Sequence, residues 1–450
     1  MSKHTAASEC LRSELELFSI PSFQSQLTSW KYIDFFPVTS LDRSGPLEFL
    51  IQGNSSHYLD LNESLFLFDC CISNGDGTAI EKTTTATDEH FKNQIVAPIN
   101  SFHSSHFKSI EIYLNGVLIS QTDNLYAYKA FFQKLLGYDL QTKESILELG
   151  QFFNDSGTLN AMATTECALN TSRNKGLTKR HGISANSKTF SSLGKIHSEL
   201  FLQPKFIPAK HEIRIKLHRS DPAFSLIAKE DLKYTVDIKK AILRIKQYEV
   251  PPHVLEPHAI LLEKKHNMMF PVRHVEMKYF TKSSDRSDLS EQNIVNGILP
   301  HRVIVGLVDS VAFNGTIQTN PLNFEHFNLS SIVLRESGVP IPYEEISVDF
   351  ANDLYHEGFF SLYQTAGKSW DAPNNLGLRY DQYNTGYALY GFNLSNTADH
   401  NCLDLIKTGK LSLNIKLSTT SSKSITIVVY LEYNKVIEID KDGNVSSFIE

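Results

Sequence analysis

The sequence of 450 residues contains few cysteines and carries no strong net charge. Its five cysteines are an odd number without metal-ligand spacing, so we expect neither a disulfide scaffold nor a zinc site, and a reducing compartment suits them. The adjacent Cys70 and Cys71 would point to opposite faces of a strand. A net charge of −7 creates no field that draws the chain to nucleic acid or to an anionic membrane, so we expect no strong nucleic-acid binding.

Long apolar runs are missing as well. The longest, residues 425–431, is much shorter than the roughly 18 residues of a membrane span, so the sequence predicts a buried strand there and no membrane span. No basic start followed by an apolar stretch opens the chain, which predicts synthesis inside the cell without a secretory signal. Glycine-rich phosphate loops are absent, and only Trp30 and Trp370 could contribute to a sugar-binding platform. We therefore expect no cofactor.

The sequence is rich in aromatic residues and in turn residues. Phenylalanine (28 residues) and tyrosine (18 residues) supply most of the 11% aromatic content, which suits the packed faces of β-sheets. Strand-like segments separated by Gly, Asn and Pro recur along the chain, about eight short ones in each half. This pattern predicts an all-β protein with few helices, built as a β-sandwich or a jelly roll. Its length favours two or three domains.

Two landmarks recur in the same order and indicate an internal duplication. Residues 106–119 predict a strand, a turn and a second strand, and a similar unit follows at 326–341. Residues 210–217 likewise resemble residues 410–417. Solenoid repeats have periods of about 20–50 residues, so this much longer period predicts two copies of one β-rich domain.

An aromatic segment follows each hairpin and provides a third landmark. The turn Asn115-Gly116 supplies the positive φ angles of a type I′ turn. Beyond it, we expect a helix with Asn124 as its N-cap, one apolar face and an end at Gly137. The aromatic residues 355–363 occupy the corresponding place after the second hairpin.

These features divide the chain into three parts. We expect an N-terminal arm at residues 1–30, which docks elsewhere, a first jelly roll at 31–250 and a second at 251–450. The boundary is placed at Pro251-Pro252 and Pro257, because proline interrupts both strands and helices.

A polar segment at about residues 155–190 is rich in Ser, Thr, Asn and Gly, and it is expected to be disordered or a long surface loop. It contains the most basic stretch of the chain, residues 173–181. Such a stretch could contact phosphate, but a solvated surface is the favoured interpretation because loops commonly carry these charges.

His103, His106 and Asp309 carry side chains that could take part in metal binding or catalysis. His103 and His106 are three residues apart, but at a loop or strand entry that spacing does not bring both imidazoles to one ion, and no third ligand lies nearby. A structural or surface role is therefore favoured over a metal site. Asp309 and the serine after it lack the Gly-x-Ser-x-Gly elbow, so residues 309–315 are interpreted as a turn. We predict no catalytic, cofactor-binding or metal residues.

Several segments stand in a characteristic order along the chain: residues 13–21, 47–49, 58–61, 112–116, 124–130, 308–315, 320–327, 386–390, 429–433 and 437–440. Their order and spacing resemble one known family, the major capsid protein (hexon) of adintoviruses and of Polinton/Maverick elements. The resemblance covers nearly the whole chain and is weakest at 155–190.

The resemblance implies a double jelly roll, that is, two eight-stranded sandwiches side by side. Three copies of such a chain would form a pseudo-hexagonal capsomer that tiles an icosahedral shell, with a minor capsid or penton protein at the vertices. It implies a structural protein of the virion and no enzyme.

Two other functional classes stay open at this point. A tandem β-sandwich captured by a host could bind carbohydrate or peptide through its loops. A β-sandwich hydrolase would use His103, His106 and Asp309.

Overall fold

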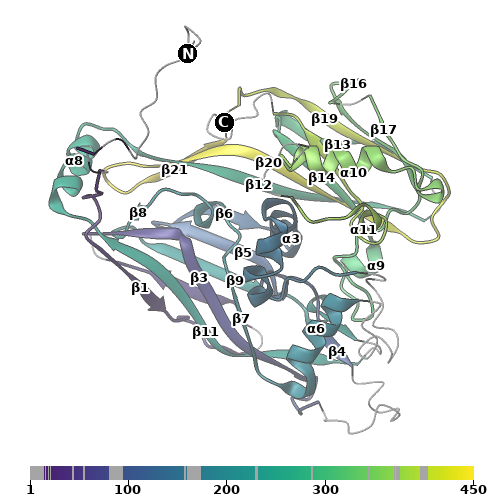
Figure 1. Ribbon diagram of the computed structural model, residues 1–450, viewed down its shortest axis with the longest axis horizontal. Coiled ribbons are helices and arrows are strands. Elements are labelled where there is room, and N and C mark those ends of the chain that lie inside the picture. Colours follow the sequence, from purple (N-terminus) through teal and green to yellow (C-terminus); the bar gives the residue numbers. More distant parts are fainter. Residues whose placement is uncertain are drawn as a thin grey trace.

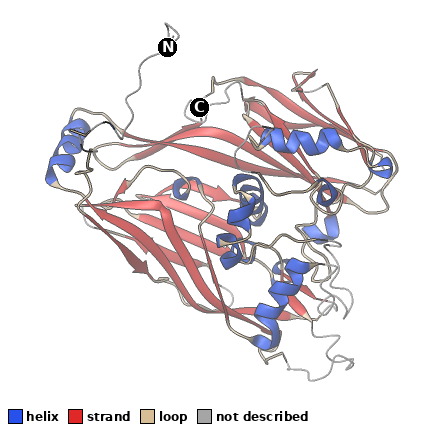
Figure 2. Cartoon of the chain, viewed as in Figure 1, coloured by secondary structure: helices blue, strands red, loops and turns tan. Residues whose placement is uncertain are grey.

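The computed structural model is built mainly from antiparallel β-sheets, with short helices between them (Figures 1 and 2). It describes residues 15, 17, 18, 20, 22–42, 45–53, 56–80, 95–156, 159, 174–228, 232–284, 287–342, 344–368, 370, 375–395 and 404–449. Among these residues, no helix is both long enough and apolar enough to cross a membrane.

Two sheets from the first half of the chain enclose one core. We call them the first sandwich. One sheet has the strand order β1-β11-β3-β7, and the other has the order β2-β9-β5-β6. The bounds are β1 Ser29–Phe35, β2 Leu47–Ile51, β3 His57–Asn74, β5 Phe107–Leu114, β6 Val117–Thr122, β7 Phe190–Gly194, β9 Ile213–Arg219 and β11 Tyr234–Glu249, while β8 (Ile207–Pro208) pairs with β3 and β4 (Val96–Pro98) with β10 (Leu226–Ala228).

Two sheets from the second half form the second sandwich. Their orders are β12-β20-β14-β18 and β13-β19-β15-β16. The bounds are β12 Met268–Lys282, β13 Asp288–Ile298, β14 Arg302–Asp309, β15 Leu329–Glu336, β16 Val339–Pro340, β18 Leu389–Asn393, β19 Thr408–Leu417 and β20 Ile425–Ile439, while β17 (Ile346–Ser347) pairs with β15 and β21 (Val445–Ile449) with β20.

The two sandwiches repeat the same arrangement position by position. The landmark segments 210–217 and 410–417 correspond to β9 and β19, and each lies second in its sheet. The two hairpins are β5-β6 and β15-β16, and their turns share left-handed backbone, at Asn115 (φ 49°) and Ser337 (φ 50°), each followed by a glycine. The predicted duplication is therefore present in the fold.

Each hairpin is followed by a helix, α3 (Tyr126–Gly137) in the first half and α10 (His356–Thr365) in the second. Helix α3 ends at Gly137 as expected, but its start differs. Asn124 adopts φ 49° and makes no cap, and Leu125 precedes the first helical residue instead. Asn readily adopts the left-handed backbone that the turn before this helix requires. Asn is also a favoured N-cap residue, so the sequence alone does not distinguish the two roles.

A helix occupies the segment where prolines were expected to break the chain. Helix α8 (Pro252–Glu263) contains Pro252 in its first turn, where the missing N–H would be unpaired in any case, and Pro257 inside it. No residue of α8 is buried. The remaining helical segments are α2 Phe102–Ser105, α4 Leu140–Lys143, α6 Lys175–Ser184, α7 Pro222–Ser225, α9 Ser310–Phe313, α11 Tyr380–Tyr383, η2 Ile146–Gly150, η4 Ala185–Ser187, η5 Glu199–Phe201 and η6 Phe350–Asn352.

Several strand predictions were wrong in detail. The expectation of short strands fails for β3, whose 18 residues pair with β11 (16 residues) along most of their length. Strand β13 was missed because its sequence, DLSEQNIVNGI, has little apolar alternation. Strand β1 begins at Ser29, inside the expected arm.

The segment 155–190 is not a continuous surface loop. Residues 175–184 form α6, in which Arg180 is buried against Asp155, and Leu159 is buried as well. Residues 160–173 lie outside the described part of the chain. Because the helix contains two glycines and few apolar residues, its sequence lacks the periodicity that would have revealed it.

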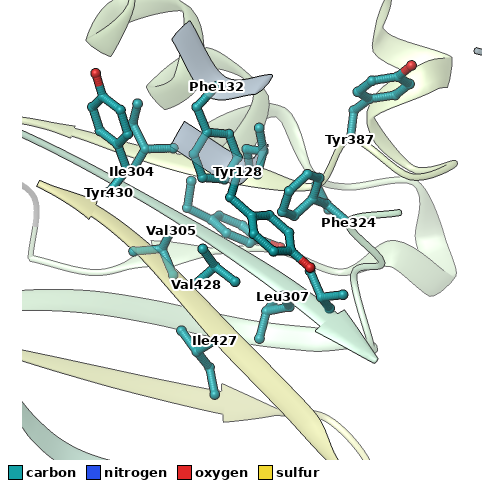
Figure 3. Packing of buried hydrophobic residues seen from close by; sticks show 14 of the residues in the cluster. Tyr128, Phe132, Ile304, Val305, Leu307, Phe324, Tyr387, Ile427, Val428 and Tyr430 are labelled. Carbon is teal, nitrogen blue, oxygen red and sulfur yellow. The ribbon is translucent and has the colours of Figure 1, made fainter. Parts of the chain in front are cut away.

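Helix α3 joins the two sandwiches. Tyr126 and Ala130 pack into the core of the first sandwich, while Tyr128 and Phe132 pack into the core of the second. In Figure 3, Tyr128 and Phe132 lie against Phe324 and the strand side chains of the second sandwich. The ring centroids of Phe132 and Phe324 are 5.1 Å apart. The sequence predicted one apolar face for this helix, whereas the structure buries two.

Candidate assembly surfaces and buried polar groups

His103 and His106 lie inside the first sandwich. His103 belongs to α2, and its ring stacks on Phe68 at 5.3 Å, while its Nδ1 is 3.2 Å from the hydroxyl of Ser192. His106 follows α2 and packs against Phe102 at 5.3 Å, and neither of its ring nitrogens has a hydrogen-bond partner among the described residues. The expected surface role is therefore excluded, and the structural role is what the fold supports.

Burial changes the acid–base behaviour of this pair. Burial lowers the pKa of His106 to about 3, with a smaller contribution from Arg219, and it lowers the pKa of His103 well below its usual value. Both imidazoles are therefore neutral at pH 7. In the described part of the chain, no group of three or more His, Cys, Asp or Glu residues could hold a metal ion.

Asp309 performs a structural task at the start of α9. Its carboxylate accepts a hydrogen bond from the Val311 N–H at 3.0 Å and lies 3.1 Å from the Lys423 ammonium. In the described structure it shares no partner with His103 or His106, which are buried among rings of the first sandwich. These contacts do not assemble the three residues into a hydrolase site.

The basic stretch 173–181 holds one buried cation, Arg180, whereas Lys175 and Lys179 are exposed to solvent as expected. The guanidinium of Arg180 has no exposed surface and donates two hydrogen bonds to Asp155, at 2.8 and 3.0 Å. Its Nε donates a third to the carbonyl of Pro98, at 2.9 Å. Tyr387, from the second half, in turn donates to the carbonyl of Asp155 at 3.4 Å. The ion pair therefore helps to fix α6 at the junction of the two sandwiches.

A second buried ion network lies between the sandwiches. Glu199 of η5 is 3.5 Å from the Lys129 ammonium of α3 and 2.9 Å from Nδ1 of His274 on β12. Burial opposes ionisation, but Lys129 and His274 outweigh it and lower the pKa of Glu199 to about 2. Lys435 of β20 adds a cross-link by donating to the Ile119 carbonyl at 3.0 Å.

The second sandwich holds a third buried carboxylate, Glu432 on β20. Tyr430 donates to it at 2.8 Å, Nε2 of His301 lies 3.1 Å away, and the guanidinium groups of Arg302 and Arg273 lie at 3.5 and 3.6 Å. Burial opposes ionisation, but Arg302 and His301 hold the pKa of Glu432 well below its usual value. These networks position strands in and between the sandwiches.

Exposed apolar side chains are concentrated at the start of the chain. Of 26 large apolar residues exposed in the described part of the chain, nine lie between residues 15 and 38. Scattered single ones are normal on a protein surface, but a concentration of this kind marks an interaction surface. The nine are Leu15, Leu17, Phe18, Ile20, Phe23, Trp30, Tyr32, Phe36 and Val38.

An aromatic surface crosses the first sheet beside this segment. Trp30 of β1 pairs with Tyr248 of β11, which pairs with Tyr58 of β3, so the three side chains form a row on one face. The Lys246 ammonium lies 5.0 Å from the Trp30 ring and 5.3 Å from the Tyr248 ring. We call this row, with Tyr32, the aromatic platform. No sequence signal could reveal it, because its members come from three distant strands.

The comparisons with known proteins agree with this architecture. No protein-family profile matches the chain. An uncharacterized protein of Caenorhabditis elegans, F54H12.2, is 24% identical over 403 residues, which cover 88% of this chain and 91% of the relative. A chain in the structure of the Sputnik virophage superposes with a TM-score of 0.64 and 10% identity, covering 98% of this chain and 93% of that one.

Two further solved structures have the same architecture. The mavirus major capsid protein superposes with a TM-score of 0.53 at 11% identity, covering 100% of this chain and 97% of that one. A chain of the PBCV-1 virus capsid gives a TM-score of 0.55 at 9% identity, covering 96% and 98%. The fold is a double jelly roll. At these identities the likeness establishes the fold alone, and the double jelly roll accounts for the two sandwiches with one strand order.

Proposed function

We propose that this chain is a major capsid protein. The observation that carries the proposal is the repetition of one strand order in two joined sandwiches, in an architecture that matches virus capsid chains over nearly their full length. Ion networks inside and between the sandwiches serve packing, and the groups once weighed for catalysis are buried or cap a helix. The proposed role is therefore structural, not enzymatic.

The duplication has a physical purpose in a shell. Two similar sandwiches in each of three chains present six near-equivalent lateral faces, so that one protein can tile a hexagonal lattice. Closed threefold symmetry would also cover strand edges and apolar side chains that a single chain exposes. We propose a homotrimeric, pseudo-hexagonal capsomer in an icosahedral virion, with a minor capsid or penton protein at the vertices.

The finer assignment follows the resemblance of the sequence. We propose that the chain belongs with the hexons of adintoviruses and Polinton/Maverick elements, divided into an arm at 1–30 and jelly rolls at 31–250 and 251–450. The relative in an animal, Caenorhabditis elegans, fits an element that resides in animal genomes.

The relative in an animal is also consistent with a second function, that of a host-captured binding module. A host-captured tandem β-sandwich with no capsid role would bind a ligand, and a cavity of about 260 Å³ near Leu299, His301 and Lys407 offers a place for one. That volume is below the roughly 300–1,000 Å³ typical of ligand pockets, so the capsid role is favoured.

The mass of the purified protein in solution distinguishes these functions. The capsid role predicts three times 50.8 kDa, or about 152 kDa, by light scattering during gel filtration. A binding module predicts the mass of one chain. A strictly monomeric protein over a wide range of concentrations would contradict the proposed function.

A further inference from the structure

The outer faces of two equivalent sheets differ in burial. The sheet β12-β20-β14-β18 of the second sandwich and the sheet β1-β11-β3-β7 of the first have the same strand order, so β20 corresponds to β11 and β14 to β3. Both faces of β14 and β20 are buried over most of their length. Strands β3 and β11 instead alternate, over much of their length, between buried and more exposed residues, so only their inner face is well covered.

The first sandwich covers the outer face of the β12-β20-β14-β18 sheet with helix α3, which lies between the two sandwiches in Figure 1. Its Tyr128 and Phe132 are each 1% exposed, and the Phe132 ring lies 6.0 Å from the Tyr430 ring of β20. Tyr430 lies opposite Ile304 of β14 on this face, and both are buried. Within this chain, therefore, an outer sheet face and the helix that follows the hairpin of the adjacent sandwich form one apolar contact.

The corresponding face of the first sandwich carries an apolar row across three strands. Leu67 of β3 lies opposite Ile242 of β11 on one side and Leu193 of β7 on the other. Their sequence neighbours Phe66 and Leu243 point the other way, into the core of the first sandwich. Ile242 is buried, whereas Leu67 and Leu193 are only partly buried. We call Leu67, Leu193 and Ile242 the outer row.

The helix that corresponds to α3 in the second half has one face that the described residues do not cover. Helix α10 packs on β18 with its buried side, where the Gly391 N–H donates a hydrogen bond to the Ser361 hydroxyl at 3.3 Å. Phe360, on its other side, is 38% exposed, and Trp370, just beyond the helix, is 88% exposed. Their ring centroids are 5.8 Å apart. Within the described chain, α10 therefore lacks the contact with a second sheet that α3 makes.

We propose that α10 of one copy covers the outer row of a second copy, with Phe360 and Trp370 against the row. The duplication identifies the occupant, because one contact of this kind already joins the two sandwiches inside each chain and the same contact between chains would alternate with it. The two surfaces differ, so the contact is head-to-tail, and such contacts close into a ring when their rotation permits. This inference rests on the proposed function and names the surfaces through which copies associate.

Variants of each surface test the contact. Leu67→Arg places a charge on the outer row, and Phe360→Arg combined with Trp370→Arg places charges beside α10. A charge that loses water without gaining a partner opposes association, so each variant is expected to raise the protein concentration at half-dissociation at least about 10-fold by light scattering. Circular dichroism is expected to stay unchanged, because all three positions are at least partly exposed in the single chain. The control Ile260→Arg, at 54% exposure on α8, should leave association unchanged.

Mixing the two variants tests the head-to-tail arrangement. Only one contact can form between them, from the intact α10 of the Leu67 variant to the intact outer row of the Phe360 and Trp370 variant. With different tags and a bifunctional chemical cross-linker, we expect a pair that carries both tags. Its mass should be twice 50.8 kDa, or about 102 kDa, without a larger closed ring.

Three outcomes would overturn the inference, namely unchanged association of either variant, an equal loss in the Ile260 control, or a mixture without the doubly tagged pair. In each of them the unaltered protein would still form trimers, so the proposed function would stand. An unaltered protein that stays monomeric would instead refute the proposed function and this inference together.

Discussion

Replacing Arg180 by Met is expected to lower the free energy of unfolding by about 3–5 kcal/mol, a large part of the 5–15 kcal/mol typical of a folded protein. The change removes three hydrogen bonds and leaves the Asp155 carboxylate buried without its cation. Desolvating an unpaired charge costs more than the pair contributed. The measurement is urea denaturation at one fixed protein concentration, because association also stabilises the folded chain.

A matched control lies one residue away on the same helix. Lys179 is 58% exposed in its side chain and pairs with Glu148, so Lys179→Met should change the free energy of unfolding by less than about 1 kcal/mol. Combining Arg180→Met with Asp155→Asn removes the stranded charge and should recover part of the loss. Equal effects of the Arg180 and Lys179 variants would show that the buried pair does not hold α6 in place.

Lowering the pH from 7 to 5 is expected to destabilise the fold through its buried histidines. The folded-state pKa of His106 is about 3, below its unfolded value of about 6.5, so the unfolded chain binds the proton first and stability falls as pH drops below about 6.5. At about 1.4 kcal/mol per pH unit, His106 alone costs about 2 kcal/mol at pH 5. Burial lowers the pKa of His103 and His197 as well, in the same direction.

The buried histidines and the buried carboxylates affect the free energy of unfolding over different pH ranges. Glu199 and Glu432 have lowered pKa values, so they contribute stability above their unfolded pKa near 4.5 and lose it only at lower pH. His106→Leu should therefore reduce the loss between pH 7 and pH 5 by about 2 kcal/mol, because neither ring nitrogen has a hydrogen-bond partner among the described residues. His253→Leu, on the exposed helix α8, is the control. Identical pH dependence in both variants would contradict the assignment.

Much of the fold could be predicted because local patterns agree with it. The resemblance between residues 210–217 and 410–417 was visible in the sequence, and both segments became the second strand of a sheet. The turn at Asn115-Gly116 was equally clear, because a type I′ turn needs a positive φ angle at both central residues and few residue pairs other than Asn-Gly adopt it readily. Such signals depend on neighbouring residues alone.

What the sequence could not reveal depends on contacts between distant segments. Arg180 lies in a basic stretch, and nothing local indicates that Asp155, 25 residues earlier, would be buried beside it. The row of Trp30, Tyr248 and Tyr58 requires the register of three strands, which follows from the packing of the whole sheet. Burial and register of this kind become known only with the structure.

The central claim is that three copies of this double jelly roll form one capsomer. Negative-stain electron microscopy of the purified protein tests it most directly. The proposed function predicts particles with a pseudo-hexagonal outline and threefold symmetry, made of three copies of the 50.8 kDa chain. Fields of particles the size of a single chain, at every concentration examined, would contradict it.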